Sequence, residues 1–262
     1  MAAGIDSSMH RRDFLAGLAG ASLSAALAGT AGAGEQLIGS LIAQSRAYPA
    51  IARRIDFISH ALLGHRYQAN SLIGGPRQPE VFVARDDRFD CVTFCETVLA
   101  AARAHDVASF EAGLRAIRYH KGVVAWRERN HDFAAWCERN VADGVCEPVA
   151  LGQPVDVTKV LDSPPALGRR RFSIAAIPKA TLLAEKAKLQ NGDIIGFVSR
   201  RPSLDYYHTG FVMFGSKGEF LLRHASESHG RVLDERMEQF IALNRVRYVT
   251  VLRPREELEK KS

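Results

Sequence analysis

The stretch Arg88-Phe89-Asp90-Cys91-Val92-Thr93-Phe94-Cys95-Glu96 predicts a helix that begins at a cysteine. It follows an extended apolar run, and the apolar residues after Cys91 recur at steps of three and four. Backbone N–H groups in the first turn of a helix lack intrahelical partners, and the helix dipole is positive there. This position is therefore expected to favour the thiolate, the form that attacks carbonyl groups or binds metals. The alternative is a small side chain buried for packing alone.

Residues 1–33 predict an export signal rather than a part of the fold. The paired arginines of His10-Arg11-Arg12-Asp13 precede an apolar run rich in Ala and Gly, and Ala31-Gly32-Ala33 provides a small-residue cleavage site. The paired arginines resemble a twin-arginine signal, which carries proteins out already folded. A periplasmic or extracellular protein without a transmembrane segment in its mature chain is expected. A buried N-terminal helix is the alternative, and translation could begin at Met1 or at Met9.

Composition predicts one ordinary globular domain with room for an insertion, or two small ones, and a single domain over residues 34–262 is expected. The chain has 262 residues, of which 47% are hydrophobic and 24% charged, enough to bury a sizeable core. The net charge of +6 is spread along the chain, and no Lys/Arg block is interleaved with aromatic residues. Nucleic acid is therefore not expected as a partner. An anionic cell-wall polymer is compatible with the charge.

The order of the expected elements favours the α+β class. Apolar spacing between 37 and 64 predicts two helices, or one long helix that breaks near Pro49. Residues 106–188 read as a mostly helical and loop insertion that faces the substrate rather than forming core. Helices are expected at 108–119, 132–141 and 234–243, and strands at 193–198, 207–214, 219–226 and 245–252. Helices that precede antiparallel strands are typical of α+β domains.

Two histidines are expected to meet on neighbouring strands. A turn at 215–218 makes a hairpin in which His208 faces about Ala225, so His224 lies almost opposite His208. Adjacent strands are about 4.8 Å apart, which lets one imidazole orient the other when both point to the same face. A register shift of one residue would change which face each side chain occupies.

These features resemble a known group of enzymes, the NlpC/P60-type cysteine hydrolases. The closer similarity is to the subgroup described as N-acetylmuramoyl-L-alanine amidase-like, DUF1460, and it covers roughly residues 50–252. The gap of 117 residues between Cys91 and His208 is longer than in ordinary members, and the insertion accounts for it. The matching segments are Gly64-His65-Arg66-Tyr67, Asp90-Cys91-Val92-Thr93-Phe94-Cys95-Glu96, Arg129-Asn130-His131, Gly192-Asp193-Ile194-Ile195, His208-Thr209-Gly210-Phe211-Val212 and His224-Ala225-Ser226.

The resemblance implies a papain-like fold, in which a helix that starts at the nucleophile packs on a C-terminal antiparallel sheet. It implies Cys91 as nucleophile, His208 as general base and His224 as the group that orients it, which agrees with the general logic of such triads. The backbone N–H of Cys91 and the Tyr67 hydroxyl are the expected oxyanion donors.

Further residues of the matching segments are expected to stabilise the oxyanion or to bind the substrate. Asp90 and Thr93 flank the nucleophile. The guanidinium of Arg129, with Asn130 and His131, could bind a peptide carboxylate or a sugar. For these three residues a solvated loop is the alternative.

The expected function is an exported cysteine amidase that cleaves the bond between N-acetylmuramic acid and L-alanine in peptidoglycan or muropeptides. Cleavage between a D-glutamyl residue and a diamino acid, or acyl transfer, is the alternative on the same scaffold. No cofactor or metal is expected. A zinc hydrolase that uses Cys91, His208 and His224 as ligands, and a non-catalytic wall-binding module, are less favoured.

The remaining cysteines have structural interpretations. Cys95 lies one turn beyond Cys91 and is expected to pack in the core, because cysteines at i and i+4 rarely reach disulfide geometry. Cys137 and Cys146 could form a disulfide in an exported protein. Asp205 is expected to be a turn residue.

Overall fold

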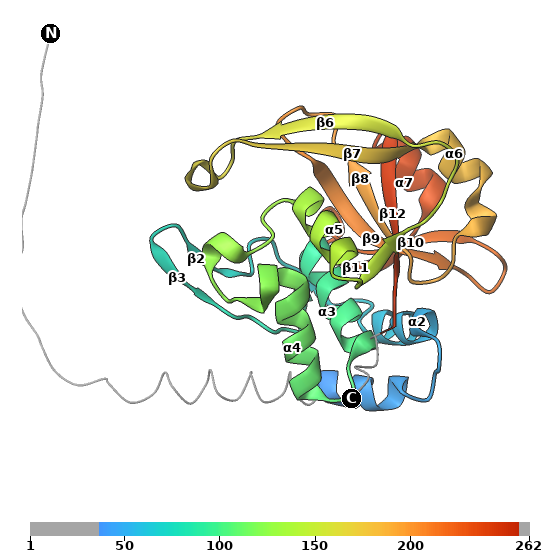
Figure 1. The fold of residues 1–262 in the computed structure, drawn as a ribbon. Helices are drawn as coiled ribbons and strands as arrows, with labels where there is room; N and C mark the ends of the chain where they lie inside the picture. Colours follow the sequence, from blue (N-terminus) through green and yellow to red (C-terminus); the bar gives the residue numbers. More distant parts are fainter. Residues whose placement is uncertain (1–36, 257–262) are drawn as a thin grey trace, which may run out of the picture.

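The computed structural model describes residues 37–256 and confirms the α+β class (Figure 1). The predicted export signal at 1–33 lies outside the described residues. Residues 37–45 are helical, and α2 (Ile51–Ala61) follows after Pro49, so the N-terminal part forms two helices rather than one. Because proline has no backbone N–H to donate, the first helix cannot continue through Pro49. Ile55 and Ile58 of α2 are fully buried.

The helix α3 (Cys91–Arg103) begins at the predicted cysteine and occupies the centre of the molecule. Every residue from Thr93 to Ala102 is buried, so α3 is surrounded by protein on all sides after its first turn. The guanidinium of Arg54 on α2 donates to the carbonyl oxygen of Ala102 and ties the two helices together. Short strands precede α3, namely β1 (Arg66–Tyr67), β2 (Ile73–Gly75), β3 (Gln78–Val81) and β4 (Arg88–Phe89).

The segment 106–188 differs from the expectation of helices and loops. The predicted helices are present as α4 (Val107–Arg118) and α5 (Phe133–Ala142). Leu114 and Trp136 on these helices are fully buried, so the segment supplies core. The segment also contains unpredicted strands, which are β5 (Cys146–Pro148), β6 (Val155–Leu161) and β7 (Arg170–Pro178), followed by α6 (Lys179–Ala184). The hairpin of β6 and β7 is paired over its whole length and extends the edge of the main sheet beside β12.

The C-terminal part forms the rest of this sheet. Its elements are β8 (Ile194–Val198), β9 (Tyr206–Phe214), β10 (Phe220–Ser226), β11 (Arg231–Arg236), α7 (Met237–Leu243) and β12 (Tyr248–Pro254). The strand order is β4-β1-β11-β10-β9-β8-β12-β7-β6, and β5 also pairs with β12. The prediction of a helix at 234–243 was wrong for its first three residues. Residues 231–236 pair with β10 as β11, and the helix begins at Met237.

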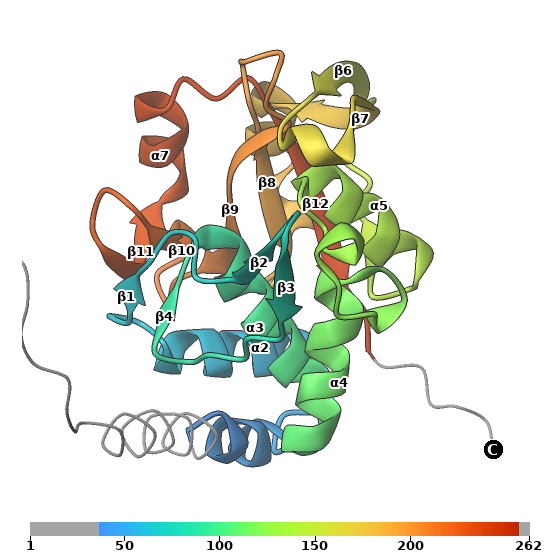
Figure 2. The same ribbon diagram turned by 90° about the vertical axis from the view of Figure 1, so that its left-hand side faces the viewer.

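The two faces of the sheet pack against different helices. Phe211 on β9 meets Phe94 of α3, with ring centroids 5.7 Å apart, whereas Phe197 on β8 meets Phe240 of α7 at 4.6 Å. Figure 2 shows α7 and α5 on opposite sides of β8, β9 and β12. Since side chains alternate along a strand, odd-numbered residues of the central part of β9 face α3, and even-numbered ones, including His208, face the side of α7.

Two further properties concern the whole described part. Within residues 37–256, no helix is both long and apolar enough to cross a bilayer. All four cysteines are free thiols, and Cys137 and Cys146 are buried rather than joined in the disulfide that was considered from sequence.

Candidate active site

A capping box fixes the start of α3 and hence the position of Cys91. The carboxylate of Asp90 accepts hydrogen bonds from the backbone N–H groups of Val92, at 3.1 Å, and Thr93, at 2.8 Å. In return the Thr93 hydroxyl accepts from the backbone N–H of Asp90 at 2.9 Å. This reciprocal pair satisfies N–H groups that the helix itself leaves free. Both side chains are engaged in the cap, which fixes the position of Cys91. A direct contact of Asp90 or Thr93 with substrate stays a prediction.

Replacing Asp90 by alanine should therefore harm both stability and catalysis. Loss of the cap is expected to lower the free energy of unfolding by about 1 kcal/mol. It should also reduce kcat/KM by roughly tenfold, because small displacements of a reacting group are costly. Denaturant unfolding and steady-state kinetics measure the two effects.

Asp106→Ala is the matched control for this prediction. Asp106 forms the same capping box with Ser109 at the start of α4, where it is exposed to solvent. Asp106→Ala should lose stability but keep kcat/KM. Equal kinetic losses in the two variants would contradict a positioning role for the cap of α3.

The Cys91 thiol lies against β9. The backbone N–H groups of Thr209, Cys91 and Val92 act to lower its pKa, but burial and the negative charge of Asp90 outweigh them and raise it to about 12. The expectation that the helix start yields a thiolate is therefore wrong for the unliganded enzyme, because burial penalises the charged form. The thiol is therefore protonated at neutral pH.

The predicted pair of histidines is present, in a register different from the expected one. Phe211 on β9 pairs with Arg223 on β10, so continuation of this register opposes His208 to Ser226 rather than to Ala225. His208 and His224 consequently share the face of the sheet on the side of α7. His208 Nε2 and His224 Nδ1 are 2.6 Å apart, with the rings nearly perpendicular at 88°.

Both imidazoles are neutral at pH 7. Burial and the neighbouring His224 lower the pKa of His208 to about 3. Burial and His229 lower the pKa of His224 to about 4, although the charge of Asp234 acts in the opposite direction. The rings also pack on Phe240 of α7, which helps to exclude water from them. A neutral imidazole with one free ring nitrogen can act as a general base.

Cys91 and the histidine pair adjoin consecutive residues of β9. The Thr209 side chain points towards α3, with its hydroxyl 3.9 Å from the sulfur of Cys95, and the Thr209 N–H lies near the Cys91 thiol. His208 immediately precedes Thr209 and uses Nε2 to reach His224. The nitrogen that remains for any partner beside the thiol is therefore Nδ1 of His208.

Tyr67 lies near Cys91. Burial, together with the charges of Glu227, Cys91 and Asp90, raises the pKa of Tyr67 to about 12. Its hydroxyl thus stays protonated through neutral pH and can donate a hydrogen bond. The backbone N–H of Tyr67 donates to the carbonyl oxygen of Gly230 at 2.9 Å, which holds β1 beside β11.

The segment Arg129-Asn130-His131 is engaged in contacts of its own neighbourhood. Arg129 forms an ion pair with Glu80 at 3.2 Å, and Asn130 donates to the carbonyl oxygen of Ile117. The ring of His131 lies 2.6 Å from the carbonyl oxygen of Trp126 and packs on its indole. These bonds hold the loop between α4 and α5 in place, so it is not a freely solvated loop. Binding of a ligand by these three residues stays a prediction.

Asp205 is buried rather than a simple turn residue. Its carboxylate accepts from the backbone N–H of Ala134 at 2.7 Å, which ties the start of β9 to the start of α5. A negative side chain stabilises the positive end of a helix dipole. No signal in the sequence indicated this contact, because the two residues lie 71 positions apart.

A cavity of about 600 Å³ opens beside the histidine pair. Its walls come from β9, β10, β11, α7 and the turn that joins β10 to β11. Two carboxylates, Glu227 and Glu235, and the ring of His229 give it polar groups, and Tyr207, Phe240 and Leu243 give it an apolar wall. Its size suits a sugar or a short peptide segment. Cys91 does not line this cavity.

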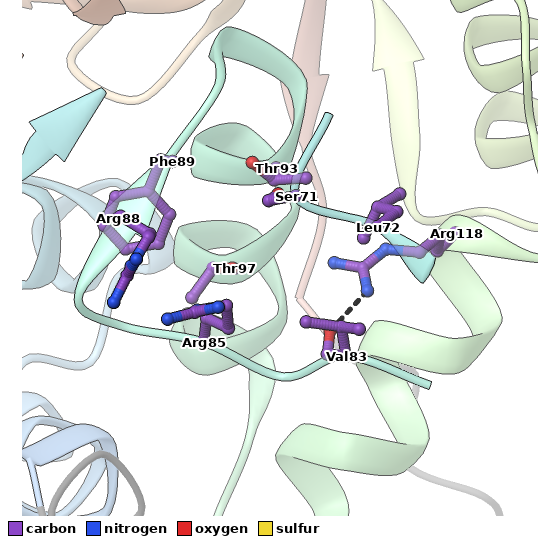
Figure 3. A pocket seen from close by; sticks show the side chains of 9 residues that line it. All are labelled: Ser71, Leu72, Val83, Arg85, Arg88, Phe89, Thr93, Thr97 and Arg118. Carbon is purple, nitrogen blue, oxygen red and sulfur yellow. Dashed lines mark hydrogen bonds between the residues drawn. The ribbon is translucent and has the colours of Figure 1, made fainter. Parts of the chain in front are cut away.

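A second hollow adjoins α3 but has no room for substrate. It is bordered by Thr93 and Thr97 of α3 and by three arginines, Arg85, Arg88 and Arg118, as Figure 3 shows. Its volume is about 10 Å³, which is about the space of one water molecule. Arg118 is occupied there, because it donates to the carbonyl oxygen of Val83.

Within residues 37–256, no three His, Cys, Asp or Glu side chains are grouped so that they could hold a metal ion. The functional candidates that sequence reasoning missed are Glu227 and Glu235. Glu235 was missed because 234–236 were expected to be helical, and Glu227 because it lies in the turn that precedes the unpredicted β11.

Comparison with models of protein families shows which family the chain matches. A family model described as AmiA-like, N-acetylmuramoyl-L-alanine amidase-like, matches residues 57–247, which include Cys91 and both histidines. The chain belongs to this amidase-like hydrolase family. A comparison with curated proteins found no match.

Solved structures have the same fold. A Legionella pneumophila protein of the DUF1460 family is 22% identical, with a TM-score of 0.75 over 89% of this chain and 98% of the other. An N-acetylmuramoyl-L-alanine amidase from Bacteroides uniformis is 24% identical, with a TM-score of 0.68 over 79% of this chain and 99% of the other. The NlpC1 protein of Trichomonas vaginalis is 13% identical, with a TM-score of 0.36 over 79% of this chain and 45% of the other.

Proposed function

We propose that this protein is a cysteine amidase that hydrolyses an amide bond of peptidoglycan or muropeptides, the bond between N-acetylmuramic acid and L-alanine. The observation that carries the proposal is the arrangement at β9. A cysteine at a helix start meets the N–H of Thr209, and the preceding His208 is joined to His224 over 2.6 Å. A papain-like, NlpC/P60-type catalytic architecture is part of the same proposal.

The reaction begins when His208 Nδ1 takes the proton of the Cys91 thiol as the sulfur attacks the substrate carbonyl carbon. The oxyanion of the tetrahedral intermediate accepts hydrogen bonds from the backbone N–H of Cys91 and from the Tyr67 hydroxyl. The C–N bond then breaks, and the imidazolium of His208 gives its proton to the departing amine. A thioester on Cys91 remains.

Hydrolysis of the thioester completes the cycle. His208 removes a proton from a water molecule that attacks the thioester carbonyl, and the second tetrahedral intermediate expels the sulfur. The carboxylic acid product leaves, and the proton held by His208 returns to the thiol. Because both the thiol and the imidazole are neutral at rest, proton transfer accompanies each attack.

The cavity beside the histidines supports a substrate with both apolar and hydrogen-bonding parts. We propose that it receives a portion of the muropeptide next to the scissile bond. The leader at 1–33 would deliver the enzyme to the periplasm or the cell exterior, where this substrate occurs.

Product analysis tests the proposed bond. Incubation of the protein with a defined anhydro-muropeptide should release an intact stem peptide that begins with L-alanine, detected by mass spectrometry. Fragments cut after D-glutamate would instead identify an endopeptidase, and transfer of the acyl group to an added amine would identify an acyltransferase.

The same assay distinguishes thiol from metal chemistry. Activity should persist after treatment with a chelator and should be lost after treatment with a thiol-directed reagent. Loss on chelation, with recovery on addition of Zn²⁺, would contradict the cysteine mechanism.

A further inference from the structure

We propose that Glu235 is a positioning residue that sets the tautomers of both imidazoles in the site. This inference rests on the proposed cysteine mechanism and adds a fourth group to it. Glu235 touches neither the thiol nor the proposed scissile bond. It acts through His224 on His208.

The geometry places Glu235 next to the unused nitrogen of His224. Glu235 on β11 pairs with Leu222 on β10, two residues from His224, so the two side chains share one face of the sheet. The carboxylate oxygen lies 3.4 Å from His224 Nε2. The His224 side chain is 2% exposed, and its Nε2 is buried without a hydrogen-bond partner. A small rotation of the carboxylate would turn this contact into a hydrogen bond.

The tautomers follow from the donors and acceptors. A neutral imidazole carries one N–H, and a carboxylate only accepts hydrogen bonds. Beside Glu235, His224 therefore keeps its proton on Nε2, and its Nδ1 becomes an acceptor. Since His208 Nε2 lies 2.6 Å from that Nδ1, His208 must supply the hydrogen of this bond. His208 then has no proton on Nδ1, which is the state that a base for Cys91 requires.

Other charged groups around His224 cannot replace Glu235 in this role. Asp234 is held by Arg223 through two bonds of 2.7 Å. His229 bonds to Ser226 at 3.0 Å and disfavours a proton on His224. Glu235 is the carboxylate within ion-pair distance of Nε2.

Glu235→Gln tests the inference because an amide can donate to Nε2 and so favour the opposite tautomer. We expect kcat to fall by about 10–100-fold, with KM nearly unchanged. This is less than the ~10⁴-fold loss found when a carboxylate bound directly to a catalytic histidine becomes an amide. Glu235→Asp should recover part of the activity. Glu238→Gln on α7 is the matched control, since Glu238 faces Lys186, and it should keep the kcat of the unmodified enzyme.

The second readout does not depend on activity. In protein labelled with ¹⁵N-histidine, the His224 signals should show a protonated Nε2, and in Glu235→Gln a protonated Nδ1. Unchanged tautomers, or a rise in KM at constant kcat, would overturn the inference and make Glu235 a substrate-binding residue or a bystander. If the unmodified protein cleaves no muropeptide, the proposed function fails, while the ¹⁵N signals still decide the tautomers.

Discussion

Replacing Cys91 by alanine is expected to lower kcat on the muropeptide substrate by about 10⁴-fold or more. The thiol supplies the only nucleophile in the proposed mechanism, so its loss removes the acyl-enzyme route entirely. Residual catalysis would come from the oxyanion donors and substrate binding alone. Release of the L-alanine-led stem peptide, measured by mass spectrometry at saturating substrate, checks this result.

Cys95→Ala is the matched control on the same helix. Cys95 is fully buried one turn beyond Cys91, and its sulfur has a weak contact of 3.9 Å with the Thr209 hydroxyl. Its replacement creates a small cavity and should cost stability but leave kcat nearly unchanged. A Cys91→Ala protein that folds and still releases the stem peptide at the normal rate would contradict the assignment of Cys91 as nucleophile.

Local signals in the sequence were sufficient to predict the elements that carry the site. The start of α3 was predicted from the apolar residues that recur at steps of three and four after Cys91, a local signal that needs no tertiary information. The histidine strands were predicted from runs of β-branched and aromatic residues around a glycine-containing turn. The side-chain partners of Arg129 and Asp205 could not be predicted, because each lies far away in sequence.

The register between β9 and β10 could not be predicted to the residue from local signals. The sequence predicted the hairpin and the closeness of His208 and His224, but a shift of one residue decides which face each side chain occupies. The observed register places both histidines on one face. The strands β6, β7 and β11 were missed for a related reason. Their partner strands, and the core that buries Phe172 and Ile174 of β7, come from distant parts of the chain and leave no local signal.

The largest effect on stability is expected from Arg118→Met. The Arg118 guanidinium and the Glu96 carboxylate form an ion pair at 2.7 Å, and each side chain is 3% exposed. Removing the cation leaves a buried negative charge without its counter-ion, which typically costs about 3–5 kcal/mol. Because native domains are stable by only ~5–15 kcal/mol, denaturant unfolding should show a clear shift of the midpoint.

Two further variants separate loss of the charge pair from loss of packing. Arg115→Met removes an arginine one turn earlier on α4, whose partner Glu111 is about one-third exposed, and it should cost less than about 1 kcal/mol. The double variant Glu96→Met/Arg118→Met removes both charges and should recover much of the stability lost in Arg118→Met. Equal losses for the single and double variants would show that shape, not charge, determines the effect.

The pH dependence gives an independent check on the buried charge. Burial raises the pKa of Glu96 in the folded protein, although Arg118 opposes this shift, so removal of Arg118 should raise the pKa further. A carboxyl group whose pKa is higher in the folded than in the unfolded state favours folding below its unfolded pKa. That contribution is lost as pH rises through the folded pKa. The deficit of Arg118→Met should therefore be largest at neutral pH and shrink as Glu96 becomes protonated. A deficit independent of pH would mean that Glu96 finds another cation or water when Arg118 is absent.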